Sequence, residues 1–368
     1  MIPKILDISP FCIYEIFFSN GGIMRNLIPK RLRVFACLAV LVFPFFLCGQ
    51  SAESSQRIER LRNQIEAITR GVKGEVGVAA RHMETGEEIF VNSDTYFPMA
   101  SVFKVPVFVE VMAQIKEGRF VLEDEVSIQK TDQHMGSGYL SDLDAPGIKM
   151  SIKNLINLMM MISDNSATDI LLTKVGAENV NNRLRSYGLE KITVDRTCQH
   201  LIMDAIGMDY EKYKGLPLDD VIKGYRKERR ENPEAFEQAT ANFSQVIKDQ
   251  SSPKAMNRLL ELIFKKEILD EESCEYIISV MLKCQTGERR LKGDLPHYVQ
   301  IAHKTGTIGG TVNNAGIIYL PDNLGHVAIT VFTKDTEDET QEVEDIIAQI
   351  SRFVYDYFYF TTDLGIDQ

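Results

Sequence analysis

The stretch Phe97-Pro98-Met99-Ala100-Ser101-Val102-Phe103-Lys104 organises the chain, because it ends in a serine and a lysine three positions apart. In a helix, residues at this spacing lie one above the other on the same face. Lys104 would therefore lie beside the Ser101 hydroxyl and, once burial lowers its pKa, could take up the hydroxyl proton. A place in the first helical turn would also direct backbone N–H groups at an oxyanion. We interpret Ser101 as a nucleophile, although this short pattern alone is more often a serine that begins a helix.

Two further motifs follow along the chain. Ser163-Asp164-Asn165 comes after an apolar run that ends at Ile162, and Lys304-Thr305-Gly306 comes after the strand-like segment Tyr298 to Ala302. S-x-x-K, S-D-N and K-T-G together form a three-part signature. By the order, spacing and context of the three motifs, residues 74–334 resemble the class A β-lactamases and their penicillin-recognising serine hydrolase relatives.

The resemblance implies both a fold and a reaction. The implied fold is α/β (α+β): an antiparallel five-stranded sheet flanked by N- and C-terminal helices, with an inserted all-helical domain. Residues 52–100 plus 291–368 would form the α/β domain, and residues 101–290 the helical domain. The implied reaction is that of an exported serine hydrolase, acylated on Ser101, that opens a β-lactam amide without a cofactor or a metal.

The resemblance also assigns catalytic roles. Ser163 would relay a proton between Lys104 and the leaving nitrogen. The backbone N–H groups of Ser101 and Thr307 would form the oxyanion hole, since both can point at the attacked carbonyl. The expected catalytic residues are therefore Ser101, Lys104, Ser163 and Thr307.

A second set of residues is expected to hold the substrate. Lys304 brings a cation and Thr305 a hydroxyl, a combination that suits the carboxylate of a β-lactam or of a peptide C-terminus. Asp164 is interpreted as structural, because it can accept backbone N–H groups where a helix starts. Tyr139, in a glycine-rich loop, could contact substrate or be an ordinary surface residue. The expected substrate-binding residues are Asn165, Lys304, Thr305, Gly306 and Tyr139.

The fourth element of the class A pattern is missing. In the family, a glutamate two residues after an arginine activates the water that hydrolyses the acyl-enzyme. Here Arg196 is present, but Cys198 stands in the glutamate's place and Ile202 in that of a following asparagine. A thiol whose pKa is ordinarily about 8.5 is a poor base at neutral pH, so Cys198 is interpreted as a packing residue rather than a catalytic one. Asp204 is the nearest other carboxylate, and it could serve as the base or hold the loop.

Residues 309–315, after K-T-G, contain no cation to match the arginine with which class A enzymes hold the substrate carboxylate. Recognition of typical penicillins is therefore expected to be weak. The missing glutamate and arginine leave two alternatives open. One is a slowly deacylating enzyme, resembling a D,D-peptidase, that acts on cell-wall peptides. The other is a non-catalytic penicillin or muropeptide sensor that signals through a charged insertion at about 208–251.

Residues 1–51 read as a leader segment. Four basic residues after Met24 precede the apolar run Val34 to Leu47, and small residues allow cleavage after Ser51. This pattern is typical of a secretory signal and predicts export to the periplasm or the medium. A lipid anchor on Cys48 is a weaker alternative, and either Met1 or Met24 could be the start.

Composition excludes some partners. The 368-residue chain has a formal net charge of −11, which becomes −14 once the leader's five basic and two acidic residues are removed. Such an acidic protein is a poor nucleic-acid binder. Three cysteines would remain after cleavage, so no obligatory disulfide framework is predicted. We expect a monomer whose partner is a small-molecule β-lactam or a cell-wall peptide.

Hydrophobic periodicity predicts the main elements. A helix is expected over residues 54–69 and another over residues 339–359. Strands are expected over residues 75–81, 88–92, 298–305, 312–320 and 326–333. Residues 107–290 read mostly as helices, and Pro106, placed five residues into the serine helix, is expected to bend it.

Overall fold

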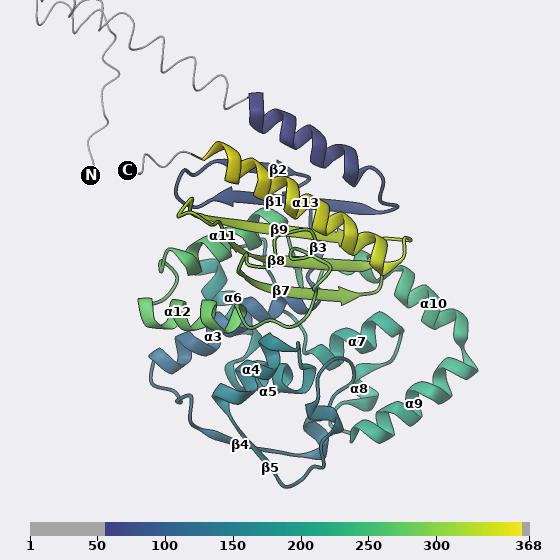
Figure 1. Ribbon diagram of the computed structural model, residues 1–368. Helices are drawn as coiled ribbons and strands as arrows, with labels where there is room; N and C mark the ends of the chain where they lie inside the picture. The colour runs from purple at the N-terminus through teal and green to yellow at the C-terminus, as the bar shows by residue number, and fades with distance from the viewer. Residues whose placement is uncertain (1–55, 363–368) are drawn as a thin grey trace, which may run out of the picture. The chain divides into compact units, whose positions relative to one another are not determined.

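The structure, a computed structural model, describes residues 56–362 and is built around one antiparallel sheet (Figure 1). Its strands lie in the order β2-β1-β9-β8-β7, so the last strands of the chain complete the sheet begun by the first hairpin. The strand β7, which carries the K-T-G motif, lies at one edge. This architecture confirms the predicted fold class. The strands are β1 (Glu75–His82), β2 (Glu88–Val91), β7 (Ile301–Ile308), β8 (Thr311–Tyr319) and β9 (His326–Lys334).

Helices cover both faces of this sheet. The C-terminal helix α13 (Thr340–Thr361) packs on β8 and β9, while α11 (Pro253–Phe264) packs on β1, β8 and β9. Figure 1 shows α13 in front of the sheet and α11 behind it. One side of α13 is apolar and buried, as its periodicity predicted. The buried positions include Val343, Ile347, Ile350, Val354 and Phe358.

The chain between β2 and β7 forms the helices that carry two of the three motifs. It also contains short strands that the sequence did not predict. β3 (Phe97–Pro98) pairs with β6 (Gln250–Ser251), and β4 (Glu125–Ile128) pairs with β5 (Ile148–Ser151). The main helices here are α3 (Lys104–Lys116), α4 (Ile152–Met161), α5 (Asn165–Val175), α6 (Ala177–Ser186), α7 (Cys198–Ile206) and α12 (Glu271–Met281).

The serine does not begin the α-helix as predicted. A 3₁₀ turn, Ala100–Phe103, contains Ser101, and α3 begins only at Lys104. Pro106 is therefore the third residue of α3 rather than an interior one. The first N–H groups of a helix have no intrahelical partner, so a proline there removes no hydrogen bond. The expected bend at Pro106 loses its physical basis.

The charged insertion is a helical excursion. It contains α8 (Tyr210–Tyr213), α9 (Leu218–Glu231) and α10 (Pro233–Ala241). A small apolar cluster holds these helices to α7. Its buried members are Met203, Met208, Tyr213, Val221 and Phe236.

The leader prediction lies outside the described residues. The N-terminal helix is described from residue 56 to residue 69, and its buried Leu61 and Ile65 belong to the predicted apolar stripe. Within residues 56–362, every helix is too short or too polar to span a lipid bilayer. The proposed domain boundaries remain predictions.

Candidate active site

Ser101 lies on a tight turn pressed against β7. Residues three apart eclipse one another in a 3₁₀ helix, so the spacing of Ser101 and Lys104 keeps both on one side. A Cβ atom at Gly306 would lie 2.6 Å from the Met99 carbonyl oxygen and 2.9 Å from the Ser101 nitrogen. Because a side chain has no room there, glycine lets β7 approach the serine turn and brings Thr307 beside it.

Lys104 is fully buried and held by the second motif. Its Nζ donates hydrogen bonds to the Ser163 carbonyl oxygen (2.7 Å), Ser163 Oγ (3.1 Å) and Asn165 Oδ1 (2.8 Å). Burial lowers the pKa of Lys104, and the nearby Cys198 and buried carboxylates oppose that change only partly. The lysine therefore loses its proton more readily than an exposed one, which suits a proton acceptor.

Ser163 links the two buried lysines. Its Oγ accepts hydrogen bonds from Lys104 Nζ and, at 3.0 Å, from Lys304 Nζ. Its φ of 63° lies in the left-handed region, which costs a non-glycine residue about 1–3 kcal/mol. The surrounding contacts hold this strained backbone in place and fix the Ser163 hydroxyl between the two lysines.

Asp164 is structural, as predicted. It caps α5, with Oδ1 accepting the Ala167 N–H at 2.9 Å. Its other oxygen accepts the N–H groups of Tyr139 and Leu140 at 2.8 and 2.9 Å. The same carboxylate thus fixes α5 and the glycine-rich loop. Tyr139 itself is 66% exposed and is not among the described residues that line the pocket, so its contact with substrate stays a prediction.

The motifs meet at one pocket of about 350 Å³. Ser101, Ser163 and Asn165 line it together with residues of the K-T-G strand. Lys304 lies beneath the surface, where its Nζ donates to the Thr305 carbonyl oxygen at 2.9 Å. Burial lowers the pKa of Lys304 to about 7. The polar lining residues are Ser101, Ser137, Ser163, Asn165, Cys198, Thr286, Arg290, Thr305 and Thr307.

Arg290 is the cation that the sequence did not reveal. It lies after α12, outside the segment searched after K-T-G, and reaches β7 from the side. One guanidinium nitrogen donates to the carbonyl oxygens of Gly306 and Asn313 at 3.0 and 2.9 Å, and another to Thr307 Oγ1 at 2.6 Å. Glu344 of α13 accepts from its Nε at 3.0 Å. The lining of the pocket therefore does include an arginine, and weak recognition of typical penicillins stays a prediction.

Cys198 occupies the pocket wall at the start of α7. Its side chain is buried, and its backbone N–H donates to Asp169 Oδ1. Burial raises the pKa of the thiol well above its usual value, despite the nearby Lys104. A thiol that keeps its proton at neutral pH cannot act as a general base. The adjacent Ile202 also lines the pocket.

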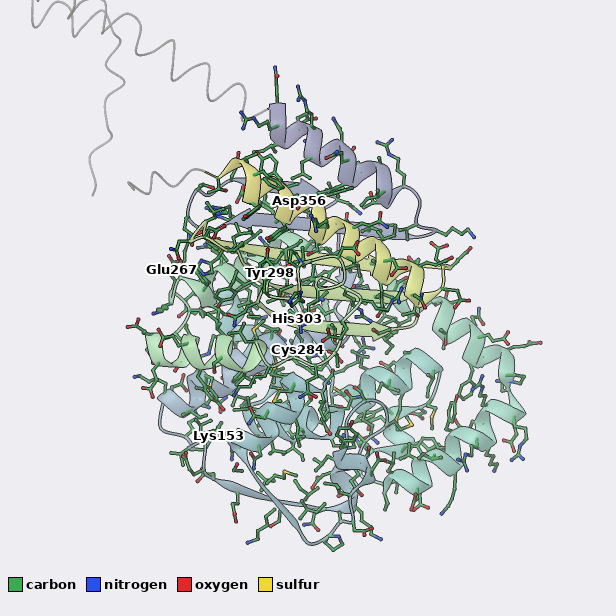
Figure 2. The ribbon with its side chains drawn as sticks, in the orientation of Figure 1. Lys153, Glu267, Cys284, Tyr298, His303 and Asp356 are labelled. Atoms are coloured by element: carbon green, nitrogen blue, oxygen red, sulfur yellow. The ribbon has the colours of Figure 1, made fainter. Side chains whose placement is uncertain are left out.

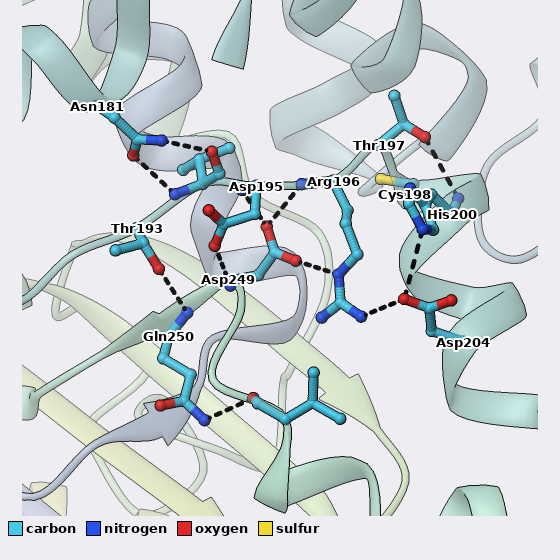
Figure 3. Close-up of polar contacts among 12 residues, drawn as sticks. Asn181, Thr193, Asp195, Arg196, Thr197, Cys198, His200, Asp204, Asp249 and Gln250 are labelled. Atoms are coloured by element: carbon cyan, nitrogen blue, oxygen red, sulfur yellow. Dashed lines mark hydrogen bonds and ion pairs between the residues drawn. The ribbon is translucent and has the colours of Figure 1, made fainter. Parts of the chain in front are cut away.

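Asp204 points away from this chemistry and into a salt-bridge cluster (Figure 3). Arg196 donates to Asp204 Oδ2 at 2.7 Å and to Asp249 Oδ2 at 2.6 Å. Arg196 and Asp249 are almost completely buried. Since Asp204 and Asp249 lie at the two ends of the excursion, the guanidinium of Arg196 fastens its base. Asp204 is absent from the residues of 56–362 that line the pocket.

The geometry is that of a serine hydrolase whose candidate nucleophile lies between helices and the edge of an antiparallel sheet. The sequence profile of the β-lactamase enzyme family matches residues 60–358. The chain belongs to this family and is a serine β-lactamase-like hydrolase, as the three motifs predicted. Within residues 56–362 no cluster of three histidine, cysteine or acidic side chains is arranged to hold a metal.

The chain is similar to individual relatives over nearly the whole length of each relative. The chain is 26% identical to β-lactamase VEB-1 of Pseudomonas aeruginosa, over 87% of this chain and 97% of the relative. It is 25% identical to a β-lactamase of Bacteroides uniformis, over 86% and 97%. The crystal structure of a β-lactamase from Chitinophaga pinensis superposes with a TM-score of 0.65 at 26% identity, covering 81% of this chain and 98% of that one.

Proposed function

We propose that the protein is acylated by β-lactams at Ser101 and releases the acyl group slowly. The observation that carries this proposal is the contrast between the buried Lys104, whose Nζ bonds Ser163 and Asn165, and the protonated thiol at Cys198. The first equips the pocket for attack on an amide, and the second leaves the pocket without a base for the following hydrolysis.

In the proposed acylation, neutral Lys104 takes the Ser101 hydroxyl proton while Oγ attacks the lactam carbonyl carbon. The N–H groups of Ser101 and Thr307 stabilise the oxyanion. Ser163 Oγ then gives its proton to the lactam nitrogen as the C–N bond breaks, and Lys104 returns a proton to Ser163. The hydrogen bond from Lys104 Nζ to Ser163 Oγ supports this relay.

The anion end of the pocket would hold the substrate carboxylate. The Thr305 and Thr307 hydroxyls and the Arg290 guanidinium lie along one side of β7, with Lys304 buried behind them. Charge-assisted hydrogen bonds to a carboxylate are about twice as strong as neutral ones. The same end could receive the C-terminal carboxylate of a cell-wall peptide, the substrate of the slow peptidase alternative.

We also propose that the protein is exported as a monomer with the leader removed after Ser51. The basic, apolar and small-residue regions of residues 1–51 support this proposal. Mass measurement of the protein isolated from its host would test the cleavage, and sedimentation would test the monomer.

Intact-mass measurement after mixing with benzylpenicillin tests the main proposal. A covalent adduct that forms quickly and decays slowly is expected. Ser101→Ala should lose the adduct completely and keep its fold, since the change removes one oxygen at the pocket surface. Ser186→Ala, an exposed position on α6, serves as the matched control and should behave as the unmodified protein. An adduct on Ser101→Ala, or none on the unmodified protein, would contradict the proposal.

A further inference from the structure

A second hollow adjoins the active-site pocket, and the mechanism above makes no use of it. It has a volume of about 620 Å³, and its described lining residues belong to α9 and α10 of the charged insertion, with the single exception of Ile206. Figures 1 and 2 show these two helices on the outer side of α7, at the right of each view. The insertion therefore forms a concave surface of its own beside the candidate active site.

Two observations connect the hollow with the active-site pocket. Ile206, the last residue of α7, lines both of them. Ile308 lines the pocket, and a Cβ atom at the next residue, Gly309, would lie 3.8 Å from Cγ2 of Thr240, which lines the hollow. A group bound in the pocket can therefore extend into the hollow past the side chain of Ile206.

The helix α10 is fixed against α7, so the hollow is part of the folded structure. Thr240 Oγ1 donates a hydrogen bond to the Ala205 carbonyl oxygen at 3.1 Å. A Cβ atom at Gly207 would lie 3.2 Å from a carbonyl oxygen of α10, so a glycine there allows the close approach of the two helices. Phe236 is buried, and its ring centroid lies 5.7 Å from that of Tyr225 on α9.

The hollow offers a cation, a carboxylate and an aromatic surface. Arg229 donates to the Tyr225 hydroxyl at 2.6 Å, and both Arg229 and Glu237 are exposed. Among residues 56–362, neither Arg229 nor Glu237 takes part in a salt bridge, with each other or with a third residue. Tyr225, Pro233 and Phe236 add ring surface to the lining. A ligand with an alkyl chain that ends in both an ammonium and a carboxylate complements these groups.

The proposed acylation decides which part of a substrate would face the hollow. In that mechanism the lactam nitrogen lies toward Ser163, and the ring carboxylate lies toward Thr305 and Arg290. The acylamino side chain is attached to the other neighbour of the attacked carbonyl carbon. This leaves it the remaining part of the lining, which α7 supplies up to Ile206. The pocket of about 350 Å³ is at the small end of sites for drug-sized ligands, so a long side chain must extend beyond it.

We propose that the hollow is a subsite for substrates whose acyl side chain ends in an α-amino acid. Arg229 binds the carboxylate of that end, Glu237 binds its ammonium, and the alkyl chain lies on Tyr225 and Phe236. This inference rests on the proposed acylation of Ser101 and specifies the substrate class of the same site.

Four penicillins separate the two charges. Their acyl groups are α-aminoadipoyl (joined through its δ-carboxyl group), adipoyl, δ-aminovaleryl and valeryl, so they differ only in the ammonium and the carboxylate at the far end. Calorimetry measures their affinity for full-length Ser101→Ala, which lacks the proposed nucleophile. The aminoadipoyl compound should bind about tenfold more tightly than the valeryl compound, with about threefold from each charge, because exposed ion pairs are weak.

Substitutions in the hollow, made in the Ser101→Ala protein, assign each charge to its partner. Arg229→Gln should remove the advantage of the aminoadipoyl over the aminovaleryl compound, and Glu237→Gln should remove its advantage over the adipoyl compound. Arg230→Gln and Glu234→Gln are the matched controls and should keep both advantages, since these exposed residues lie on the same helices but outside the lining. Equal affinities for the four penicillins, or equal losses in the controls, would overturn the proposal.

Adduct formation on the unmodified protein, measured by intact mass, separates this inference from the proposed function. Adducts with all four penicillins, together with equal affinities for Ser101→Ala, contradict the subsite alone. The expected order of affinities without any adduct contradicts the acylation of Ser101 and leaves the subsite established. If Ser101→Ala binds none of the four, the subsite is overturned as well.

Discussion

The two walls of the pocket differ in the chemistry they offer. On the wall formed by β7 and the start of α5, hydroxyls and an amide line the pocket, and the cations Lys104, Lys304 and Arg290 lie close to them. On the α7 wall, Cys198, Leu201 and Ile202 present a protonated thiol and alkyl groups. In the proposed mechanism the groups for attack and the groups for release would occupy different walls, so one set can be present while the other is absent.

The physical reason lies in what each step needs. Attack needs a proton acceptor near Ser101 and donors for the oxyanion. In the proposed mechanism the buried Lys104 is the acceptor and backbone N–H groups are the donors. Release needs a water that is held and deprotonated on the opposite side. An isoleucine side chain offers no hydrogen bond to such a water, and a thiol with a raised pKa does not take its proton.

Replacement of Lys104 should have the largest effect of all, on the rate of acylation. Lys104→Ala removes the proton acceptor, so acylation by benzylpenicillin should slow by about 10²–10⁴-fold. Stopped-flow or quenched intact-mass measurement gives the rate. Lys153→Ala, an exposed position on α4, is the control. If Lys104→Ala were acylated at the normal rate, another group would have to be the base.

Restoring a base on the α7 wall should have the next largest effect. The double variant Cys198→Glu, Ile202→Asn places a carboxylate near Lys104 and an amide for the water. We expect the adduct to decay about 10²-fold faster. Cys198→Ser with Ile202→Asn controls for the change in volume. Equal decay of the two double variants would show that the missing carboxylate does not limit release.

Raising the pH should have a smaller effect, which is weaker binding of benzylpenicillin on the wall that contains Lys304. The pKa of Lys304 is lowered to about 7, so its ammonium is present below pH 7 and is lost above it. Benzylpenicillin binding during acylation should therefore weaken above pH 7, by up to about tenfold per pH unit. The apparent KM for acylation, measured between pH 6 and 8.5, reports this. A KM that stays constant through pH 8.5 would mean that Lys304 keeps its proton or does not act on the carboxylate.

The smallest effect is expected at Asp204. Asp204→Asn should change the decay of the adduct by less than about twofold, because the carboxylate bonds Arg196 instead of lining the pocket. Adduct lifetime by intact mass is the measurement, and a thermal unfolding scan checks the fold. A release rate that falls tenfold or more would make Asp204 the base and reverse our interpretation of the α7 wall.

The sequence predicted the sheet and the three motifs because both depend on local patterns. Alternating or continuous apolar runs mark the strands, and the motifs are read from residue order alone. The strand β7 begins at Ile301, three residues later than predicted, because Tyr298 belongs to the turn that leads into the strand. The structural role of Asp164 was predictable because an aspartate before an apolar helix is a capping pattern.

Arg290 could not be found in this way. Its contacts with β7 join segments that meet only after the chain has folded, and it belongs to no local motif. The 3₁₀ turn at Ser101 was missed for a different reason. Its sequence is compatible with an α-helix or a 3₁₀ helix, and packing against Gly306 decides which of the two forms. Short strands such as β4 and β5 contain too few residues to show a recognisable hydrophobic periodicity.

The salt bridges of Arg196 have a consequence for how this chain can change over generations. One guanidinium bonds both Asp204 and Asp249 and so fixes the two ends of the excursion. The rest of the protein therefore depends on where these ends lie and very little on the number of residues between them. The entropy of closing a loop grows only slowly with the number of residues in it. Lineages could therefore lengthen, shorten or exchange these helices while the serine turn stays as it is, and the position between the two carboxylates is a natural graft point for a foreign module.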